Sequence, residues 1–216
     1  MLGYAFCGSF CTHRRALAEL RNLREANNEV LPIMSETVWT TDTRFGRASD
    51  LCKEVEEICG RPIVHTIADA EPIGPRVNLE ALIVSPCTGN TLAKIAEGIT
   101  DTAVCMAVKA HLRSDRPLIL ALASNDALSS NLKNIATLLL RKQVYFVPMQ
   151  QDDPVSKPHS LVADFSLLPE TLNAALEGRQ YRRLFLLPRN EGVGLLFFRR
   201  ACGSMRALLC RCSPSV

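Results

Sequence analysis

The sequence predicts an α/β protein, a Rossmann-like or flavodoxin-like three-layer sandwich built around a mainly parallel sheet. Its hydrophobic pattern alternates between short unbroken apolar runs, which are typical of buried strands, and segments with helical periodicity. The 216 residues suffice for one well-buried domain and are too few for two of ordinary size. Hydrophobic residues make up 47% of the chain and aromatic residues only 6%, which indicates an aliphatic core.

The first third of the chain reads as two strand–helix pairs. Residues 2–7 and 30–34 are apolar runs that end in small or hydroxyl residues, so both are predicted strands. Residues 12–26 and 47–59 place apolar side chains three and four positions apart, which predicts a helix after each strand. Gly60 is a typical stop for the second helix.

The middle third contains a central strand and two helices. Residues 63–67 form a short possible strand, and the Glu-Pro-Ile-Gly-Pro run at 71–75 is a loop. The apolar run 81–84 predicts a buried strand that turns at Pro86, and residues 103–112 predict a helix. Between them, the helical spacing of apolar residues predicts an amphipathic helix carrying Leu92, Ile95, Ala96 and Ile99.

The last part of the body continues the same alternation. Residues 118–123 and 144–147 are predicted strands, with a helix between them at 131–141. Residues 149–158 are polar, hold two prolines and are predicted to form a loop. A final helix is predicted at 169–176, with proline in its first turn.

The charge distribution separates a body at 1–180 from a tail at 181–216. The tail holds seven Arg and one acidic residue, whereas the body holds 18 basic and 21 acidic side chains. We therefore expect no nucleic-acid binding by the body. The tail lacks a sustained period, so it is interpreted as disordered or atypical, with binding to an anionic partner or membrane surface as the alternative.

Cysteine usage and the apolar segments bear on compartment and metal binding. Nine cysteines without a secretory signal predict reduced thiols in the cytoplasm. No apolar run approaches the roughly 18 residues of a membrane span. The chain has no CxxC pair and its four histidines are scattered, so no metal site is predicted.

Three polar turns follow three of the predicted parallel strands. They are Gly8-Ser9, the hydroxyls Ser35 and Thr37, and the segment 88–91. Ligands of open α/β sheets bind beyond the carboxyl ends of the strands, so the three turns should face one crevice. Any single turn could be ordinary helix capping. Neither GxGxxG nor a Walker motif is present, and three small hydroxyl turns together favour a mononucleotide-type ligand.

The segment 85–101, SPCTGNTLAKIAEGITD, resembles the PASANT-type segment of the flavin-dependent cysteine decarboxylase superfamily. That superfamily includes phosphopantothenoylcysteine decarboxylases, lantibiotic cysteine decarboxylases and flavin prenyltransferases. The resemblance implies a Rossmann-like protein that packs into trimers and binds FMN where two copies meet. It places the flavin phosphate at Gly8, Ser9 and Ser35. It places the ring and ribityl chain beside Pro86, Thr88, Gly89, Asn90, Thr91, Ser124 and Asn125.

Four further motifs narrow the resemblance to the family of dipicolinate synthase B subunits. They are TDTRFG at 41–46, AEPIGP at 70–75, SNDAL at 124–128 and YFVPMQQDDP at 145–154. The likeness covers residues 2 to 178. It implies an oxidoreductase subunit that works with an NADP-dependent A subunit during sporulation. The pair would convert a (hydroxy-)tetrahydro- or dihydrodipicolinate precursor, a small dicarboxylate, to dipicolinate, and this chain would form a homotrimer or a higher multiple.

The chain departs from the other relatives where their chemistry resides. The only candidate for the decarboxylase histidine is His65, 21 residues before Pro86, and it is interpreted as a loop or surface residue. The glutamate and tyrosine of the flavin prenyltransferases are replaced in the turns after residues 123 and 149. Both of these flavoenzyme classes therefore remain alternatives without their catalytic groups.

The remaining candidates bear on catalysis. A cyclic diacid needs cationic or helix N-terminal partners. Asn90 is a candidate neutral donor to a flavin or substrate carbonyl, and Asp126 is a candidate base or a turn cap. Two hypotheses stay open: a catalytic flavin subunit, or a non-catalytic scaffold for the A subunit. The candidates for holding the diacid are Arg44, Lys94, Lys109 and Lys157.

Overall fold

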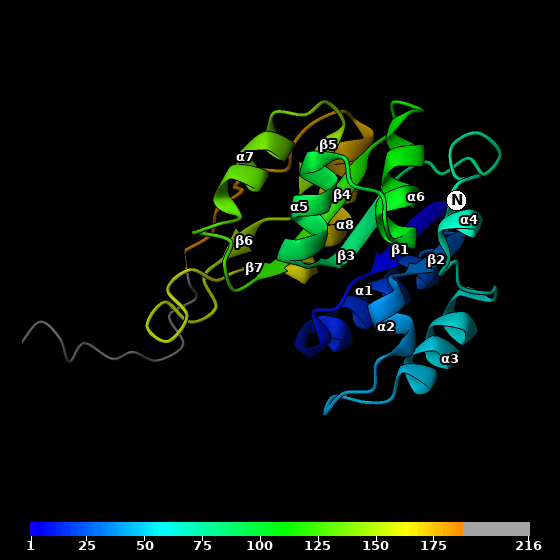
Figure 1. Ribbon diagram of the computed structural model, residues 1–216. Helices are drawn as coiled ribbons and strands as arrows, with labels where there is room; N and C mark the ends of the chain where they lie inside the picture. The colour runs from blue at the N-terminus through cyan, green and yellow to red at the C-terminus, as the bar shows by residue number, and fades with distance from the viewer. Residues whose placement is uncertain (188–216) are drawn as a thin grey trace, which may run out of the picture.

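A five-stranded parallel sheet forms the centre of the protein, whose computed structural model describes residues 1–187 (Figure 1). The strands run in the order β2-β1-β3-β4-β5, which is the flavodoxin-like order. The predicted α/β class and parallel sheet are confirmed. The strands are β1 (Leu2–Phe6), β2 (Val30–Met34), β3 (Leu82–Cys87), β4 (Leu118–Ser124) and β5 (Val144–Phe146).

Helices cover both faces of the sheet and complete the three layers. One face packs against α1 (His13–Glu25), α3 (Ala48–Cys59) and α8 (Leu168–Leu176). The other packs against α5 (Gly89–Glu97), α6 (Ala103–Leu112) and α7 (Leu132–Leu139). Short helical segments occur in the connections: η1 (Phe10–Thr12), α2 (Glu36–Thr40), α4 (Ile67–Ala70) and η2 (Phe165–Leu167).

The side chains of strand β1 alternate between the two hydrophobic clusters of the core. Leu2, Tyr4 and Phe6 point into the cluster beneath α1 and α3, whereas Ala5 and Cys7 belong to the cluster beneath α5 and α6. This alternation follows from the two-residue period of a strand. Because both faces are covered, the strand reads as a continuous apolar run, which is typical of buried parallel strands.

The polar stretch after β5 differs from its prediction as a loop. Met149–Gln150 forms β6, which pairs antiparallel with β7 (Leu161–Ala163), and β7 pairs antiparallel with the end of β4. Only the intervening segment 151–159 projects as a loop, seen at the left of Figure 1. These strands are two and three residues long, too short for a period to be recognised in the sequence.

Two other element boundaries differ from the sequence prediction. The central strand does not end before Pro86 but continues to Cys87, with its register to β4 shifting between Val84 and Cys87. At such an irregularity the missing N–H of proline removes no regular ladder bond. Residues 63–67 contribute a single parallel bridge, between Ile33 and Val64, instead of a strand.

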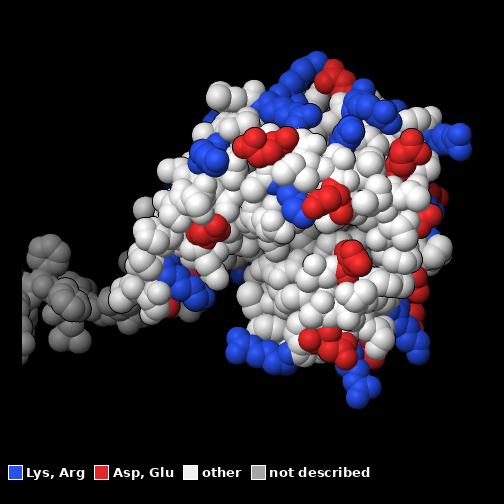
Figure 2. Space-filling view, viewed as in Figure 1, with Lys and Arg blue, Asp and Glu red and all other residues white. Residues whose placement is uncertain are grey.

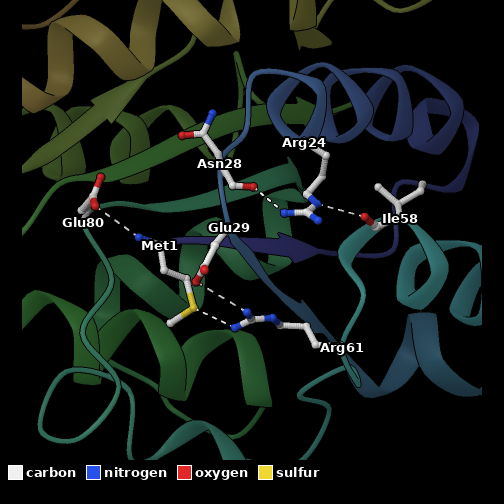
Figure 3. Close-up of polar contacts among 7 residues, drawn as sticks. All are labelled: Met1, Arg24, Asn28, Glu29, Ile58, Arg61 and Glu80. Atoms are coloured by element: carbon white, nitrogen blue, oxygen red, sulfur yellow. Dashed lines mark hydrogen bonds and ion pairs between the residues drawn. The ribbon is translucent and has the colours of Figure 1, made fainter.

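Polar contacts of Arg24 tie α1 to its neighbours at the amino end of the sheet (Figure 3). The Arg24 Nε donates to the carbonyl of Ile58 at 3.0 Å, and a second guanidinium nitrogen donates to the carbonyl of Asn28 at 2.7 Å. One half-buried cation thus satisfies two carbonyl groups near the ends of α1 and α3.

The N-terminus closes the same end of the sheet. The Met1 amino group lies 3.2 Å from Glu80, just before β3. Arg61 donates to the Met1 sulfur and lies 3.6 Å from Glu29. Each of these exposed ion pairs adds little stability by itself. Together with the Arg24 hydrogen bonds, they engage charged groups of this end with partners inside the chain.

The chain continues to form hydrogen bonds with the folded body beyond residue 180. Gln180 exchanges two hydrogen bonds with the backbone of Phe146, at 2.9 and 2.7 Å. The backbone of Met149 then forms two hydrogen bonds with this segment. Its N–H donates to the carbonyl of Leu184 and its carbonyl accepts from the N–H of Leu186, each at 2.9 Å. The first residues of the segment predicted as a tail therefore lie alongside β6.

Residues from 188 onward, the greater part of the predicted tail, lie outside the described residues. In residues 1–187, no helix is both long and apolar enough to cross a membrane. Figure 2 shows acidic and basic side chains interspersed over the visible face of the body, with the basic groups most numerous along the upper edge.

Candidate functional site

The turns after β1 and β2 lie against one another at the carboxyl end of the sheet. A Cβ atom on Gly8 would lie 3.6 Å from the Thr37 methyl group, so the two turns are in contact. Ser35 follows β2, and its N–H donates to the carbonyl of Phe6 on β1. Ser9 accepts from Thr12 at the start of the following helix. The sequence-predicted phosphate residues are thus brought together.

The Ser35 hydroxyl is buried and lacks a hydrogen-bond partner within the described residues. Ser35 occupies the N-cap of α2, yet its side chain caps no backbone group there. A buried hydroxyl without a partner costs about 1–3 kcal/mol, and natural proteins seldom leave one unsatisfied. An oxygen of a bound anion would satisfy it.

The turn after β3 presents a helix N-terminus to the same edge. Thr88 caps α5, its hydroxyl oxygen accepting from the N–H of Thr91 at 3.2 Å. The first N–H groups of a helix have no intrahelical acceptor, so those of Gly89 and Asn90 remain for a ligand. Asn90 is exposed, and its side chain forms no hydrogen bond within residues 1–187.

Gly89 is backed by a polar cluster on the turn after β4. A Cβ at this position would lie 2.7 Å from the Asn131 amide nitrogen and 2.8 Å from an Asp126 oxygen, with the Ser124 hydroxyl closer still. Such distances are not compatible with a side chain, so only glycine fits here without displacement. The β3 and β4 turns are therefore packed together as the sequence predicted.

Asp126 holds this cluster together. Its carboxylate accepts from the hydroxyls of Ser124 and Ser130 and from the Asn131 amide, the last two at 2.8 Å. These bonds, that from Ser124 foremost, lower the pKa of the Asp126 carboxyl below its usual range. A carboxylate stabilised in this way is a weak base, so the geometry favours a positioning role for Asp126. Asn125, next to it, is exposed.

Buried thiols lie beneath the α5 N-terminus. Burial raises the pKa of Cys7 to about 12, although the Thr91 hydroxyl and the Thr88 backbone bond to it. Burial likewise raises the pKa of Cys87 well above its usual value. Both thiols therefore stay protonated near neutral pH and act as small apolar core residues, not as nucleophiles. The Cys7 contacts join the β1 turn to the β3 turn.

Other sequence candidates lie apart from this edge or are already engaged. The His65 ring stacks on Trp39 with ring centroids 3.9 Å apart, a packing role. Lys94 pairs with Asp101 at 2.8 Å. Lys157 pairs with Asp152 at 3.1 Å.

The other two cationic candidates differ in position. Lys109 lies in the last turn of α6, and a helix between parallel strands runs back toward their amino ends, so Lys109 belongs to the opposite edge. Arg44 lies on the loop between α2 and α3, with its guanidinium 4.9 Å from the centre of the Phe45 ring.

Sequence reasoning missed His13 and Asn131. His13 is buried at the start of α1, and its Nε2 donates to the carbonyl of Cys7 at 2.8 Å. Burial lowers the pKa of its ring. Asn131 donates to Asp126 and accepts from Asn134. Each of the two residues follows a strand by several positions, in or just after the turn expected there. Their spacing in the sequence does not indicate where their side chains point.

The site as a whole is a row of four adjoining turns at the carboxyl ends of β2, β1, β3 and β4. Figure 2 shows a hollow on this side of the molecule, below the projecting loop 151–159. Hydroxyls, helix N–H groups and exposed amides line the row, and the described residues add no free carboxylate base. Such a surface can bind a phosphate and a polar ring but cannot itself supply strong acid–base catalysis.

Comparison with known proteins gives the same assignment for the fold. The model of the Flavoprotein family matches residues 5–164. The dipicolinate synthase B subunit of Bacillus subtilis (strain 168) is 37% identical over 185 residues, which cover 86% of this chain and 92% of that protein.

Two solved structures extend the comparison. The crystal structure of the dipicolinate synthase B subunit from Bacillus halodurans has a TM-score of 0.79 and 40% identity, covering 86% of this chain and 95% of that one. A dodecameric FMN-dependent Ubix-like decarboxylase from Escherichia coli O157:H7 has a TM-score of 0.53 and 26% identity, covering 64% of this chain and 74% of that one.

Proposed function

Because the chain belongs to the Flavoprotein family, we propose that it is a flavin-binding B subunit of a dipicolinate synthase. Together with an NADP-dependent A subunit, it converts a (hydroxy-)tetrahydro- or dihydrodipicolinate precursor to dipicolinate in the cytoplasm of a sporulating cell. The observation that carries the proposal is the row of small, hydrogen-bonding turns along the carboxyl edge, in a chain similar to dipicolinate synthase B subunits over nearly its whole body.

The residues of this edge fit an FMN molecule. The buried Ser35 hydroxyl has no partner among the described residues and can donate to a phosphate oxygen. Gly89 packs directly on the Ser124–Asp126–Asn131 cluster, where a Cβ would clash, whereas a Cβ on Gly8 would make only ordinary contacts of 3.6 Å or more. The groups that would hold the phosphate are Gly8, Ser9, Ser35 and Thr37, and those beside the ring and ribityl chain are Pro86, Thr88, Gly89, Asn90, Thr91, Ser124 and Asn125.

Bound FMN would supply the two-electron redox chemistry that the side chains lack. The residues of the chain itself would position and polarise the flavin and the substrate. Asn90 presents an exposed amide at the first turn of α5, where it can donate to a carbonyl of the flavin or the substrate. Asp126 orients Ser124 and Asn131 behind Gly89 and thereby fixes the shape of the site.

The expected protein partners are inferred from a motif that the sequence lacks and from the relatives of the chain. No GxGxxG fingerprint occurs in the sequence, so the nicotinamide cofactor is assigned to the A subunit. The family resemblance implies FMN at an interface between copies of the chain, and one FMN-dependent relative is dodecameric. We therefore expect a homotrimer or a multiple of it, with neighbouring copies covering the hollow at the carboxyl edge.

A second candidate function is a non-catalytic scaffold for the A subunit. The hydrogen bonding of Asp126 favours it, because the most plausible base of the site is engaged by three donors and has a lowered pKa. In this alternative the flavin fold serves assembly alone.

The visible absorption spectrum of the purified protein, before and after addition of FMN, tests the flavin proposal. Bound FMN should give the flavin absorption bands after gel filtration, and a colourless protein that ignores added FMN would contradict the proposal. Reconstitution with the A subunit then separates the two functions. Asn90→Ala should lower dipicolinate formation by about tenfold or more without loss of fold, since Asn90 is exposed. A wild-type rate would favour the scaffold.

A further inference from the structure

A cavity beside the row of turns has not been accounted for by the flavin proposal. It has a volume of about 570 Å³ and lies between the start of α1, the loop 41–47 and the first turns of α3. This volume falls within the range of small-molecule pockets. Its lining is partly apolar, with Phe10, Leu17, Val38 and Leu51.

Three arginines line the cavity, and one of them, Arg44, has its guanidinium over the Phe45 ring. The guanidinium groups of Arg14, Arg44 and Arg47 form no ion pair and no hydrogen bond among residues 1–187. Of the two acids on the wall, Glu54 is paired with Arg21 at 2.5 Å, which leaves Asp50 as the one acid without an ion pair in residues 1–187 against three arginines. The cavity is therefore electropositive, and unpaired arginines are the side chains best suited to bidentate recognition of carboxylates.

The TDTRFG motif builds the loop that carries Arg44. Thr43 and Gly46 exchange backbone hydrogen bonds at 3.0 and 3.1 Å, which closes a tight turn with Arg44 and Phe45 at its tip. The Asp42 carboxylate accepts from the N–H of Ala48 at 2.8 Å and so anchors the loop to the start of α3. The motif thus holds one cation and one aromatic ring at the mouth of the cavity before any ligand arrives.

The cavity adjoins the flavin residues without including them. None of the proposed FMN-binding residues lines it. Phe10 nevertheless lines the cavity and also lies 3.6 Å from where a Gly8 Cβ would be. Val38, which follows Thr37, is part of the same wall. A ligand in this cavity would lie next to the phosphate-binding turns of β1 and β2.

We infer that this cavity is a binding site for a small cyclic dicarboxylate, the substrate class of the proposed function, on which the inference rests. Three arginines whose guanidinium groups form no ion pair and no hydrogen bond in residues 1–187 match two carboxylates, and the aromatic and aliphatic walls match a flat six-membered ring. Arg44 and Arg47 approach from the loop and Arg14 from α1, so a diacid would be held from two sides.

Calorimetric titration of dipicolinate into the full-length protein, in metal-free buffer, tests this inference. Arg44→Gln and Arg47→Gln should each weaken dipicolinate binding by about tenfold or more, because each removes a charge-assisted bidentate contact. Picolinate, with one carboxylate, should bind the wild type correspondingly less tightly. Arg141→Gln is the matched control, since Arg141 is an exposed arginine outside the cavity.

Titration of FMN into the same variants separates the inference from the proposed function. Unchanged FMN binding with lost dipicolinate binding supports a distinct diacid site. Wild-type dipicolinate affinity in both loop variants, or no binding to the wild type, would overturn the inference while leaving the flavin proposal standing. Parallel loss of FMN affinity would assign the arginines to the flavin phosphate and overturn it as well. Dipicolinate binding without any FMN binding would instead contradict the flavin proposal alone.

Discussion

The two ends of the parallel sheet are built from the same strands but differ in how their polar groups are engaged. At the amino end, Arg24 satisfies two carbonyls and the Met1 amino group pairs with Glu80, although the buried His111 Nδ1 has no partner within residues 1–187. At the carboxyl end, Ser35 keeps a buried hydroxyl without a partner in residues 1–187, and the Asn90 amide is exposed.

The difference separates stability from binding. A satisfied polar group adds to folding, whereas a preorganised unsatisfied one costs free energy until a ligand arrives. Changes at the amino end should therefore alter the free energy of unfolding alone. Changes at the carboxyl end should alter FMN affinity as well, sometimes with no loss of stability.

The sharpest test of this contrast is a pair of glycine substitutions. Gly89→Ala should weaken FMN binding by about 100-fold, because the new methyl group must displace the Ser124–Asp126–Asn131 cluster behind the site. Gly3→Ala adds the same methyl group near the amino end, 2.7 Å from terminal carbons of Leu79 and Leu82. Both variants should lose about 1–3 kcal/mol of stability. Equal FMN affinities, measured by flavin fluorescence, would break the comparison.

Arg24→Ala tests the amino end on its own. It leaves the half-buried carbonyls of Ile58 and Asn28 without their donor, so the free energy of unfolding should fall by about 1–3 kcal/mol in urea titrations. FMN affinity should stay at the wild-type value. The exposed Arg21→Ala, which removes a surface ion pair with Glu54, is the control and should cost less than about 1 kcal/mol. A reduced FMN affinity in Arg24→Ala would show that the two ends are not independent.

Lowering the pH should destabilise the folded protein through one buried histidine at each end of the sheet, because protonation of these rings favours the unfolded chain. Burial lowers the pKa of His13, beside the β1 turn, and of His111, whose Nε2 donates to Pro117 before β4. Each ring is neutral in the folded protein and takes up a proton more readily when unfolded. The stability they contribute is present above the unfolded pKa of about 6.5 and is lost as pH falls below it.

The expected loss between pH 7 and pH 5.5 is on the order of 1 kcal/mol, measured by urea unfolding at each pH. His111→Gln should flatten this slope, and so should His13→Gln. A slope unchanged in both variants would contradict this account, because carboxylates with pKa values of about 4 hardly titrate in this window.

The row of turns could be predicted from the sequence because its logic is one of backbone geometry. Parallel strands bring their carboxyl ends to one edge, so Gly8, Ser35 and Gly89 were placed together by the strand pattern alone. The donors around Asp126 were not foreseen, although Ser130 and Asn131 lie within five residues of it. Side-chain direction within a turn depends on packing, which local spacing does not encode.

The antiparallel extension was missed for a different reason. β7 is three residues long and owes its strand form to pairing with the end of β4, some 40 residues earlier. Gln180 is likewise held by Phe146 from a strand far back in the chain. Such segments have little intrinsic preference, and tertiary contacts decide their conformation.

The most direct test of the central claim is a paired measurement on Ser35→Ala. FMN affinity by fluorescence quenching and the free energy of unfolding of the flavin-free protein should be measured on the same preparations. If the Ser35 hydroxyl is reserved for the flavin phosphate, FMN binding should weaken by about tenfold, while the flavin-free variant should be as stable as the wild type or slightly more so. A variant that binds FMN with wild-type affinity, or that loses stability instead, would contradict the account.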